Sequence, residues 1–125
     1  MMIDFQNKKL FKLKPEDLNA GFVAVKELLI ENESVIDSYV SMRDRVVFTN
    51  KRIISINVQG ITGTKKDYTS IPYSKIQTYS VETAGLLDLD AELDIWISGI
   101  GRIRFEIKGS ANIIKLCQAI STLIL

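Results

Sequence analysis

The chain has 125 residues, of which 46% are hydrophobic and 25% charged, and sixteen Lys and Arg against fifteen Asp and Glu leave a net charge of +1. This length suits one globular domain, and so small a net charge excludes a global field that would draw the protein to nucleic acid. The absence of histidine excludes imidazole metal ligation and imidazole acid-base catalysis. Cys117 is the only cysteine, which excludes an internal disulfide and fits a reducing compartment.

The first residues lack the continuous apolar run of a secretory signal, because Asp4 and the polar residues up to Lys9 interrupt it. No stretch approaches the roughly 18 apolar residues that a membrane span requires. We therefore expect a cytoplasmic protein with an unprocessed N-terminus, soluble or peripheral at a membrane. Residues 1–14 are predicted to form a basic and apolar arm ahead of a single domain at 15–125.

A helix is predicted at the start of this domain. Pro15 followed by two acidic residues is typical of a helix N-terminus. The apolar residues behind it recur at helical spacing, namely Leu18, Phe22, Val25 and Leu29. This stripe predicts an amphipathic helix over 15–31 that ends near Asn32 and packs on the domain or on a neighbouring copy.

Strand patterns follow between residues 34 and 108, separated by short polar turns that force antiparallel neighbours. The clearest is 91–98, where apolar and polar residues alternate with the period of two of a half-buried strand. After the turn 99–101 the alternation resumes with Ile103, Phe105 and Ile107 on one face. Two strands that share an apolar face predict a hairpin packed on a core.

A second helix is predicted over 110–125, with Ser110 as its N-cap. Its apolar stripe consists of Ile113, Cys117, Ile120 and Ile124, and two leucines, Leu116 and Leu123, widen it. This helix is more apolar than packing on a single sheet requires. It therefore either sits deeply in the domain or meets another subunit.

Seven antiparallel strands closed by one C-terminal helix is the order of a pleckstrin-homology (PH) barrel. The local strings VVFTNKRII, ITG, SIPYSKI, SVETAG, DLDAELDIWISG and FEIKGS occur in the order expected for the bacterial PH domain family, which the chain resembles from about Leu28 to Leu125. The resemblance implies a mainly β fold, a split barrel of two nearly orthogonal sheets capped by the helix. It also implies ring-like homo-oligomers and no catalysis.

The sequence departs from lipid-binding PH domains in the first strand-to-strand loop. Phosphoinositide-binding relatives carry several Lys and Arg there, whereas this loop is short and offers Arg43 and Arg45, split by Asp44. The departure argues against inositol-phosphate recognition, which the fold alone cannot supply.

The predicted homo-oligomer interface consists of Trp96, Arg104, Leu116 and Leu123. Trp96 points to the outer face of its strand, and a three-residue turn at 99–101 would set it opposite Arg104. Because aromatic residues and Arg are enriched at interfaces, this pair suggests an assembly contact, with simple surface packing as the alternative.

The alternating acids between Asp88 and Asp94 do not fit an EF-hand calcium loop, since its sixth and twelfth positions would hold Leu93 and Gly99. Charge pairing across the hairpin with Arg102, Arg104 and Lys108 explains Glu92 and Asp94 instead. No metal site or cofactor is predicted.

The basic residues nominated for a membrane or an anion are Lys8, Lys9, Lys12, Lys14, Lys65 and Lys66. The first four alternate with apolar residues, a pattern that can lie on an anionic membrane, although we favour the alternative of an arm or tail that packs on its own domain. We therefore expect a non-enzymatic PH-like domain that self-assembles. The alternatives are an unidentified protein partner and an anionic membrane surface.

Overall fold

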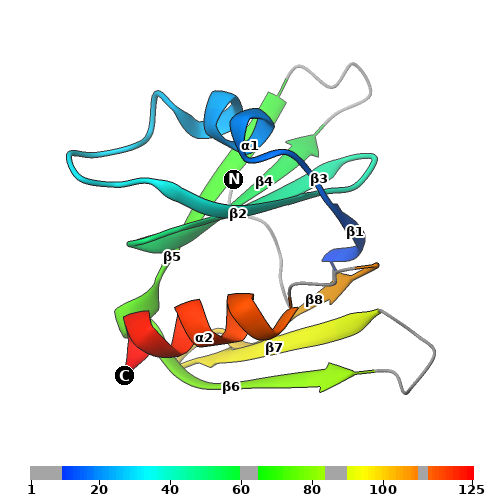
Figure 1. The fold of residues 1–125 in the computed structure, drawn as a ribbon, viewed down its shortest axis with the longest axis vertical. Coiled ribbons are helices and arrows are strands. Elements are labelled where there is room, and N and C mark those ends of the chain that lie inside the picture. Colours follow the sequence, from blue (N-terminus) through cyan, green and yellow to red (C-terminus); the bar gives the residue numbers. More distant parts are fainter. Residues whose placement is uncertain (1–9, 60–64, 84–89, 110–112) are drawn as a thin grey trace.

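The structure is a computed structural model that describes residues 10–59, 65–83, 90–109 and 113–125 (Figure 1). Within these ranges the elements in chain order are β1 (Leu10–Pro15), α1 (Leu18–Val25), β2 (Val35–Val40), β3 (Asp44–Thr49), β4 (Arg52–Gln59), β5 (Lys65–Pro72), the short 3₁₀ helix η1 (Tyr73–Lys75), β6 (Ile76–Thr83), β7 (Ala91–Ile97), β8 (Gly101–Ile107) and α2 (Ile113–Ile124).

The strands form one sheet in the order β5-β4-β3-β2-β1-β8-β7-β6. The sheet curls into two halves, β2–β5 and β6–β8, and β1 joins them where Lys14 pairs with Val40 and Leu13 pairs with Ile107. Figure 1 shows the halves facing each other, with α2 lying across the opening between them. The predicted mainly β barrel closed by a C-terminal helix is confirmed, in the form of one curled half-barrel sheet.

The predicted count of seven antiparallel strands is corrected to eight in the described ranges, with one parallel pair. The additional strand is β1, which falls mostly in the predicted arm at 1–14 and runs parallel to β8. Leu13 is 1% exposed in the core, and its carbonyl oxygen accepts a hydrogen bond from the N–H of Lys108 at 2.8 Å. This segment is therefore part of the sheet, while residues 1–9 lie outside the described ranges.

The first helix is shorter than the predicted 15–31 at both ends. It ends at Val25, and at its predicted start the chain is still in the sheet. Pro15 pairs with Tyr39 of β2, and the N–H of Glu16 donates to the carbonyl oxygen of Ser38 at 3.0 Å. Asp17 is the N-cap, and its carboxylate accepts from the N–H of Asn19 at 3.4 Å. Helix formation can therefore start only after the chain leaves β1.

The main core lies between the two halves of the sheet. The predicted alternation on the β7–β8 hairpin is confirmed, since Leu93, Ile95, Ile103 and Phe105 are all at most 1% exposed. A second, smaller cluster lies on the outer face of the first half, beneath α1, and consists of Val25, Val47, Ile54 and Ile56. The helix α1 thus covers the outside of the half-barrel.

The helix α2 closes the core with Ile113, Leu116 and Ile120, which are 9%, 3% and 0% exposed. Its described part begins at Ile113, so the predicted cap at Ser110 lies outside the described residues. The sequence left open whether this apolar helix sits deeply in the domain or meets another subunit. Packing within the domain accounts for its three buried residues.

Candidate functional site

The outer face of the β7–β8 hairpin carries Trp96 and Arg104. The register pairs Trp96 with Arg102 and Arg104 with Asp94, so the predicted pairing of Trp96 with Arg104 is wrong. The turn comprises residues 98–100, one position earlier than expected. This shift moves every cross-strand partner by two residues and leaves each side chain on its predicted face, because the strand period is two.

Arg104 is held by two acids on this face, which confirms the predicted charge pairing. Its Nε and Nη2 donate to the two carboxylate oxygens of Asp94 at 2.9 and 3.0 Å, and Nη1 lies 3.3 Å from Glu92. The hydrogen bonds to Asp94 raise the pKa of Arg104 above its usual value. Asp94 is 8% exposed, so this bidentate pair is largely a structural contact within the chain.

The two predicted interface residues of α2 lie elsewhere. Leu116 is buried in the core, and Leu123 is half-buried against it. Trp96 and Arg104 lie on a sheet face that points away from this core. The four nominated residues therefore belong to two separate surfaces.

The structure separates the nominated basic residues as well. Lys8 and Lys9 lie outside the described ranges, and for Lys12 only the backbone is described. Lys14 is an exposed residue of β1. Lys65 and Lys66 are exposed and begin β5, whereas the sequence placed them in a loop. As consecutive residues of one strand, they point to opposite faces of the sheet.

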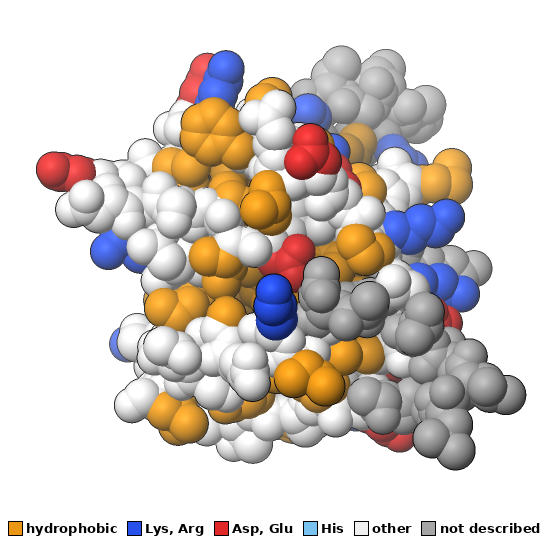
Figure 2. Space-filling view, viewed as in Figure 1, with side chains coloured by type: hydrophobic (Ala, Val, Ile, Leu, Met, Phe, Trp, Pro, Cys, Tyr) orange, Lys and Arg blue, Asp and Glu red, His pale blue; other side chains and the backbone are white. Residues whose placement is uncertain are grey.

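The exposed face of α1 is apolar. Its stripe was expected to pack on the domain or on a neighbouring copy, and two of its members, Leu18 and Phe22, are 47% and 45% exposed. The short helix packs on the sheet through Gly21 and Val25, and Leu18 and Phe22 lie at the edge of that contact. Figure 2 shows hydrophobic side chains gathered in patches on the face of the molecule that carries α1 and α2.

A groove with a volume of about 480 Å³ lies between the start of α1 and the side of α2. Its apolar lining comes from Leu18, Ile36, Leu116 and Ala119, and its charged lining from Glu16, Asp17, Asp37 and Lys115. The exposed Leu18 of α1 thus lines the same groove as the nominated Leu116.

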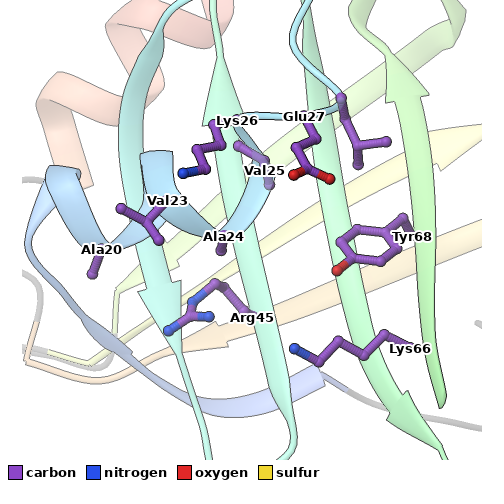
Figure 3. A pocket seen from close by; sticks show the side chains of 10 residues that line it. Ala20, Val23, Ala24, Val25, Lys26, Glu27, Arg45, Lys66 and Tyr68 are labelled. Atoms are coloured by element: carbon purple, nitrogen blue, oxygen red, sulfur yellow. The ribbon is translucent and has the colours of Figure 1, made fainter. Parts of the chain in front are cut away.

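A second groove, of about 670 Å³, lies on the other side of α1, against β3 and β5 (Figure 3). The helix and the residues after it supply an apolar wall that includes Val23, Ala24 and Leu28. Arg45 of β3 and Lys66 of β5 supply positive charge, and Tyr68 of β5 adds an aromatic hydroxyl. No single stretch of sequence contains this combination, so the sequence pattern could not reveal it.

The only cysteine of the chain, Cys117, is partly buried. Burial raises the pKa of the Cys117 thiol, which lowers its thiolate fraction near neutral pH. Nowhere in the described ranges do three or more acidic or cysteine side chains form a group that could hold a metal ion. Nor is any described helix long and apolar enough to cross a bilayer.

A curled sheet in two facing halves, with a C-terminal helix across the opening, defines a β-barrel domain of the pleckstrin-homology type. The family model described as "Bacterial PH domain" matches residues 4–124. The chain belongs to this family.

Two proteins of Bacillus subtilis (strain 168) are similar in sequence. "Uncharacterized protein YjqA" is 54% identical over 72 residues, which cover 58% of this chain and 58% of that protein. "Uncharacterized protein YozO" is 33% identical over 69 residues, which cover 55% of this chain and 60% of that protein. The chain thus spans about three-fifths of the length of each of these relatives.

Solved structures confirm the fold. A DUF1696 family protein with a pleckstrin-homology domain from Shewanella loihica is 37% identical with a TM-score of 0.78, over 90% of this chain and 97% of that one. A pleckstrin homology domain from Shewanella amazonensis is 38% identical with a TM-score of 0.65, over 95% of this chain and 93% of that one. A PH domain containing protein from Exiguobacterium sibiricum, at 20% identity and a TM-score of 0.69 over 90% of this chain and 61% of that one, supports the fold alone.

Proposed function

We propose that this chain is a non-enzymatic binding domain that acts in the cytoplasm by assembling with further copies of itself. The single observation that carries the proposal is the exposed apolar edge of α1, where Leu18 and Phe22 are 47% and 45% exposed. Helices on the surface of a monomer usually turn charged residues outward, and contiguous exposed apolar patches mark interaction sites.

The groove between α1 and α2 extends this patch. Leu18 lines the groove at one side and Leu116 at the other, so an inserted side chain would contact both helices. Its charged lining includes both Asp37 and Lys115, and a surface with both signs can be complementary to another copy of itself. These features support a contact between copies and make α1 a stronger candidate than the hairpin face around Trp96.

Absolute mass in solution, measured by light scattering behind a sizing column across a roughly tenfold dilution, tests the proposal. We expect a stable multiple of the 14.1 kDa chain. The variant Phe22→Ser is expected to lower the mass while the circular dichroism spectrum stays unchanged. Ile114→Ser is the matched control, because Ile114 is a 71% exposed apolar residue of α2 and does not belong to the exposed apolar edge of α1.

A monomeric wild type at every concentration would overturn self-assembly. Trp96→Ala and Leu123→Ala examine the other two nominated surfaces in the same experiment. If either of them, and not Phe22→Ser, reduces the mass, the assembly contact lies on that surface and α1 has another role.

Anionic lipid binding is the second candidate function, favoured by the exposed side chains of Lys14, Lys65 and Lys66. Salt-sensitive co-sedimentation with vesicles that contain phosphatidylserine would support it. A truncation that tests the N-terminal segment must stop at residue 9, because β1 belongs to the sheet. Equal co-sedimentation of neutral and anionic vesicles would exclude this function.

A further inference from the structure

We propose that the free edge of β6 binds an extended peptide segment of another protein, which adds to the sheet as a further strand. In the order of the described strands β6 is the last, so one side of its backbone pairs with β7 and the other side has no strand partner. The N–H and C=O groups on a free edge can hydrogen-bond to an added strand, which is a common mode of peptide recognition. The edge therefore offers backbone affinity, and the neighbouring side chains decide which peptide fits.

The two edges of the sheet differ in how they are protected from such pairing. At the other edge, β5 begins with Lys65 and Lys66 and ends with Pro72, and natural proteins place lysine and proline on edge strands to prevent pairing. In contrast, β6 contains neither lysine nor proline, and Glu82 is its only charged residue. Its register with β7 is regular from Thr78 to Thr83. The edge of β6 is therefore the one that remains open to another strand.

The outer side of this edge is acidic. Glu82 is exposed, and the register sets it opposite Glu92, which in turn lies opposite Glu106. Arg104 lies 3.3 Å from Glu92, whereas the Glu82 carboxylate has no ion-pair partner in the described part of the chain. Like charges that face each other across a sheet are destabilising, so a lysine or arginine beside Glu82 would stabilise the added strand. This charge favours a basic peptide.

The inner side of the edge is flanked by an exposed apolar residue of α2. The hydroxyls of Tyr79 and Ser121 are hydrogen-bonded at 2.5 Å, so this side of the helix lies next to β6 (Figure 1). Ile114 precedes Ser121 by about two turns and therefore lies on the same side of α2, where it is 71% exposed. An apolar side chain on the inner face of the added strand would cover Ile114 and remove apolar area from water.

The two sides of the edge together specify the peptide. Successive residues of a strand point to opposite faces, so a segment in which basic and apolar residues alternate places its charges near Glu82 and its apolar side chains near Ile114. The inference is independent of self-assembly, because the proposed assembly groove is lined by Ala119, which lies on the other side of α2 from Ser121.

The probe is a fluorescently labelled peptide of sequence TVKVKVT with blocked ends, titrated with the full chain and followed by fluorescence anisotropy. We expect saturable binding. The acidic peptide TVEVEVT should bind more weakly by about tenfold or more, because its charges repel Glu82. The peptide TVKVKVT with N-methylated internal amides should also lose about tenfold or more in affinity, because these amides cannot donate to the edge of β6.

Variants of the chain test each side of the edge. Glu82→Gln is expected to weaken binding of TVKVKVT by about fivefold or more. Glu106→Gln is the matched control, because it removes the same charge from the same row of acids, two strands away from the edge. Ile114→Ser should weaken peptide binding without changing the mass in solution, and Phe22→Ser should lower the mass without changing peptide binding. A failure of self-assembly and a failure of this site are therefore distinguishable.

Several results would overturn the proposal. No saturable binding of TVKVKVT by the wild type, or equal binding of its N-methylated form, would mean that the edge of β6 does not pair with a peptide. Equal weakening by Glu82→Gln and Glu106→Gln would mean non-specific charge attraction. A lower mass in solution for Glu82→Gln than for the wild type would assign the edge to a second copy of the chain instead.

Discussion

Arg52 and Glu33 form a bidentate ion pair that ties β4 to the segment between α1 and β2. Nε and Nη2 of Arg52 each donate to a Glu33 oxygen at 3.0 Å, and the Glu33 side chain is fully inaccessible to solvent. The hydroxyl of Thr49 donates to the same carboxylate at 2.6 Å, and the N–H of Ile30 donates at 3.0 Å. Arg52 also donates to the carbonyl oxygen of Leu28, so the chain after α1 is held against the sheet.

The ionisation of Glu33 makes this contact dependent on pH. Burial alone would raise the pKa of Glu33, but hydrogen bonds from Arg52, Thr49 and the Ile30 N–H outweigh it, so the pKa lies below the ordinary value of 4.5. A depressed folded-state pKa stabilises the protein above the unfolded-state pKa, and this stability is lost as pH falls through the folded-state value.

Glu33→Gln should therefore lower the free energy of unfolding at about pH 7 by about 1–3 kcal/mol. The difference in the free energy of unfolding between the variant and the wild type should shrink as pH falls below 4.5, because the Glu33 carboxylate of the wild type then becomes protonated. Urea unfolding across this range measures both effects. Glu31→Gln is the control, since Glu31 is exposed on the same segment, and an equal loss in both variants would contradict a specific role for Glu33.

Gly21 allows α1 to approach β2 closely. A Cβ at this position would lie 2.5 Å from the Ser38 Oγ and 2.6 Å from its Cβ. Gly21→Ala should cost about 1–3 kcal/mol of stability, although alanine is the better helix former by about 1 kcal/mol. The second substitution Ser38→Gly removes both clashing atoms, so Gly21→Ala should cost less stability in the Ser38→Gly background than in the wild type, as measured by thermal unfolding. Additive losses would contradict a steric cause.

The two acids that hold Arg104 should contribute unequally. Asp94 makes both hydrogen bonds and is 8% exposed, whereas the Glu92 side chain is 36% exposed and lies 3.3 Å away. Asp94→Asn should lower the free energy of unfolding by about 1 kcal/mol or more, because Arg104 loses its bidentate partner. Glu92→Gln should change it by less than about 0.5 kcal/mol. Equal losses of stability for Asp94→Asn and Glu92→Gln in chemical denaturation would show that the pair of Asp94 with Arg104 has no special role.

The helix α2 offers a matched pair of isoleucines that tests its role in the core. Ile120 is 0% exposed and Ile114 is 71% exposed on the same helix. Ile120→Ala should destabilise by about 2–5 kcal/mol through lost burial and a residual cavity, whereas Ile114→Ala should cost less than about 0.5 kcal/mol. Calorimetric unfolding of both variants measures the difference. A small effect at Ile120 would mean that the half-barrel is stable without its closing helix.

The sequence pattern predicted the faces of β7 and β8 correctly but not their register. Alternation requires only that side chains such as Leu93 and Phe105 point inward, and a shift of two residues satisfies the same pattern. The turn position decides whether Trp96 meets Arg102 or Arg104, and the backbone places it at 98–100. The partner of Trp96 is therefore a property of the turn geometry rather than of the apolar pattern.

The first part of the chain differed most from expectation, and the reason is competition between local and tertiary interactions. Pro15 and the acids behind it are typical of a helix start, but the pairing of Pro15 with Tyr39 holds this segment in the sheet. Similarly, helical spacing predicted one apolar stripe that includes Leu18 and Phe22, but it left open whether the stripe packs on the domain or on a neighbouring copy. The close packing of Gly21 on Ser38 turns these two side chains toward solvent.

The sequence by itself determined the mainly β class, the closing helix and the inward faces of the final hairpin, because these follow from the period of apolar residues along the chain. Only the tertiary structure decided the parallel pairing of β1 with β8, the exposed edge of α1 and the free edge of β6 beside α2. Each of these depends on contacts between residues distant in sequence. Such contacts form through packing and hydrogen bonding across the fold, and no local pattern encodes them.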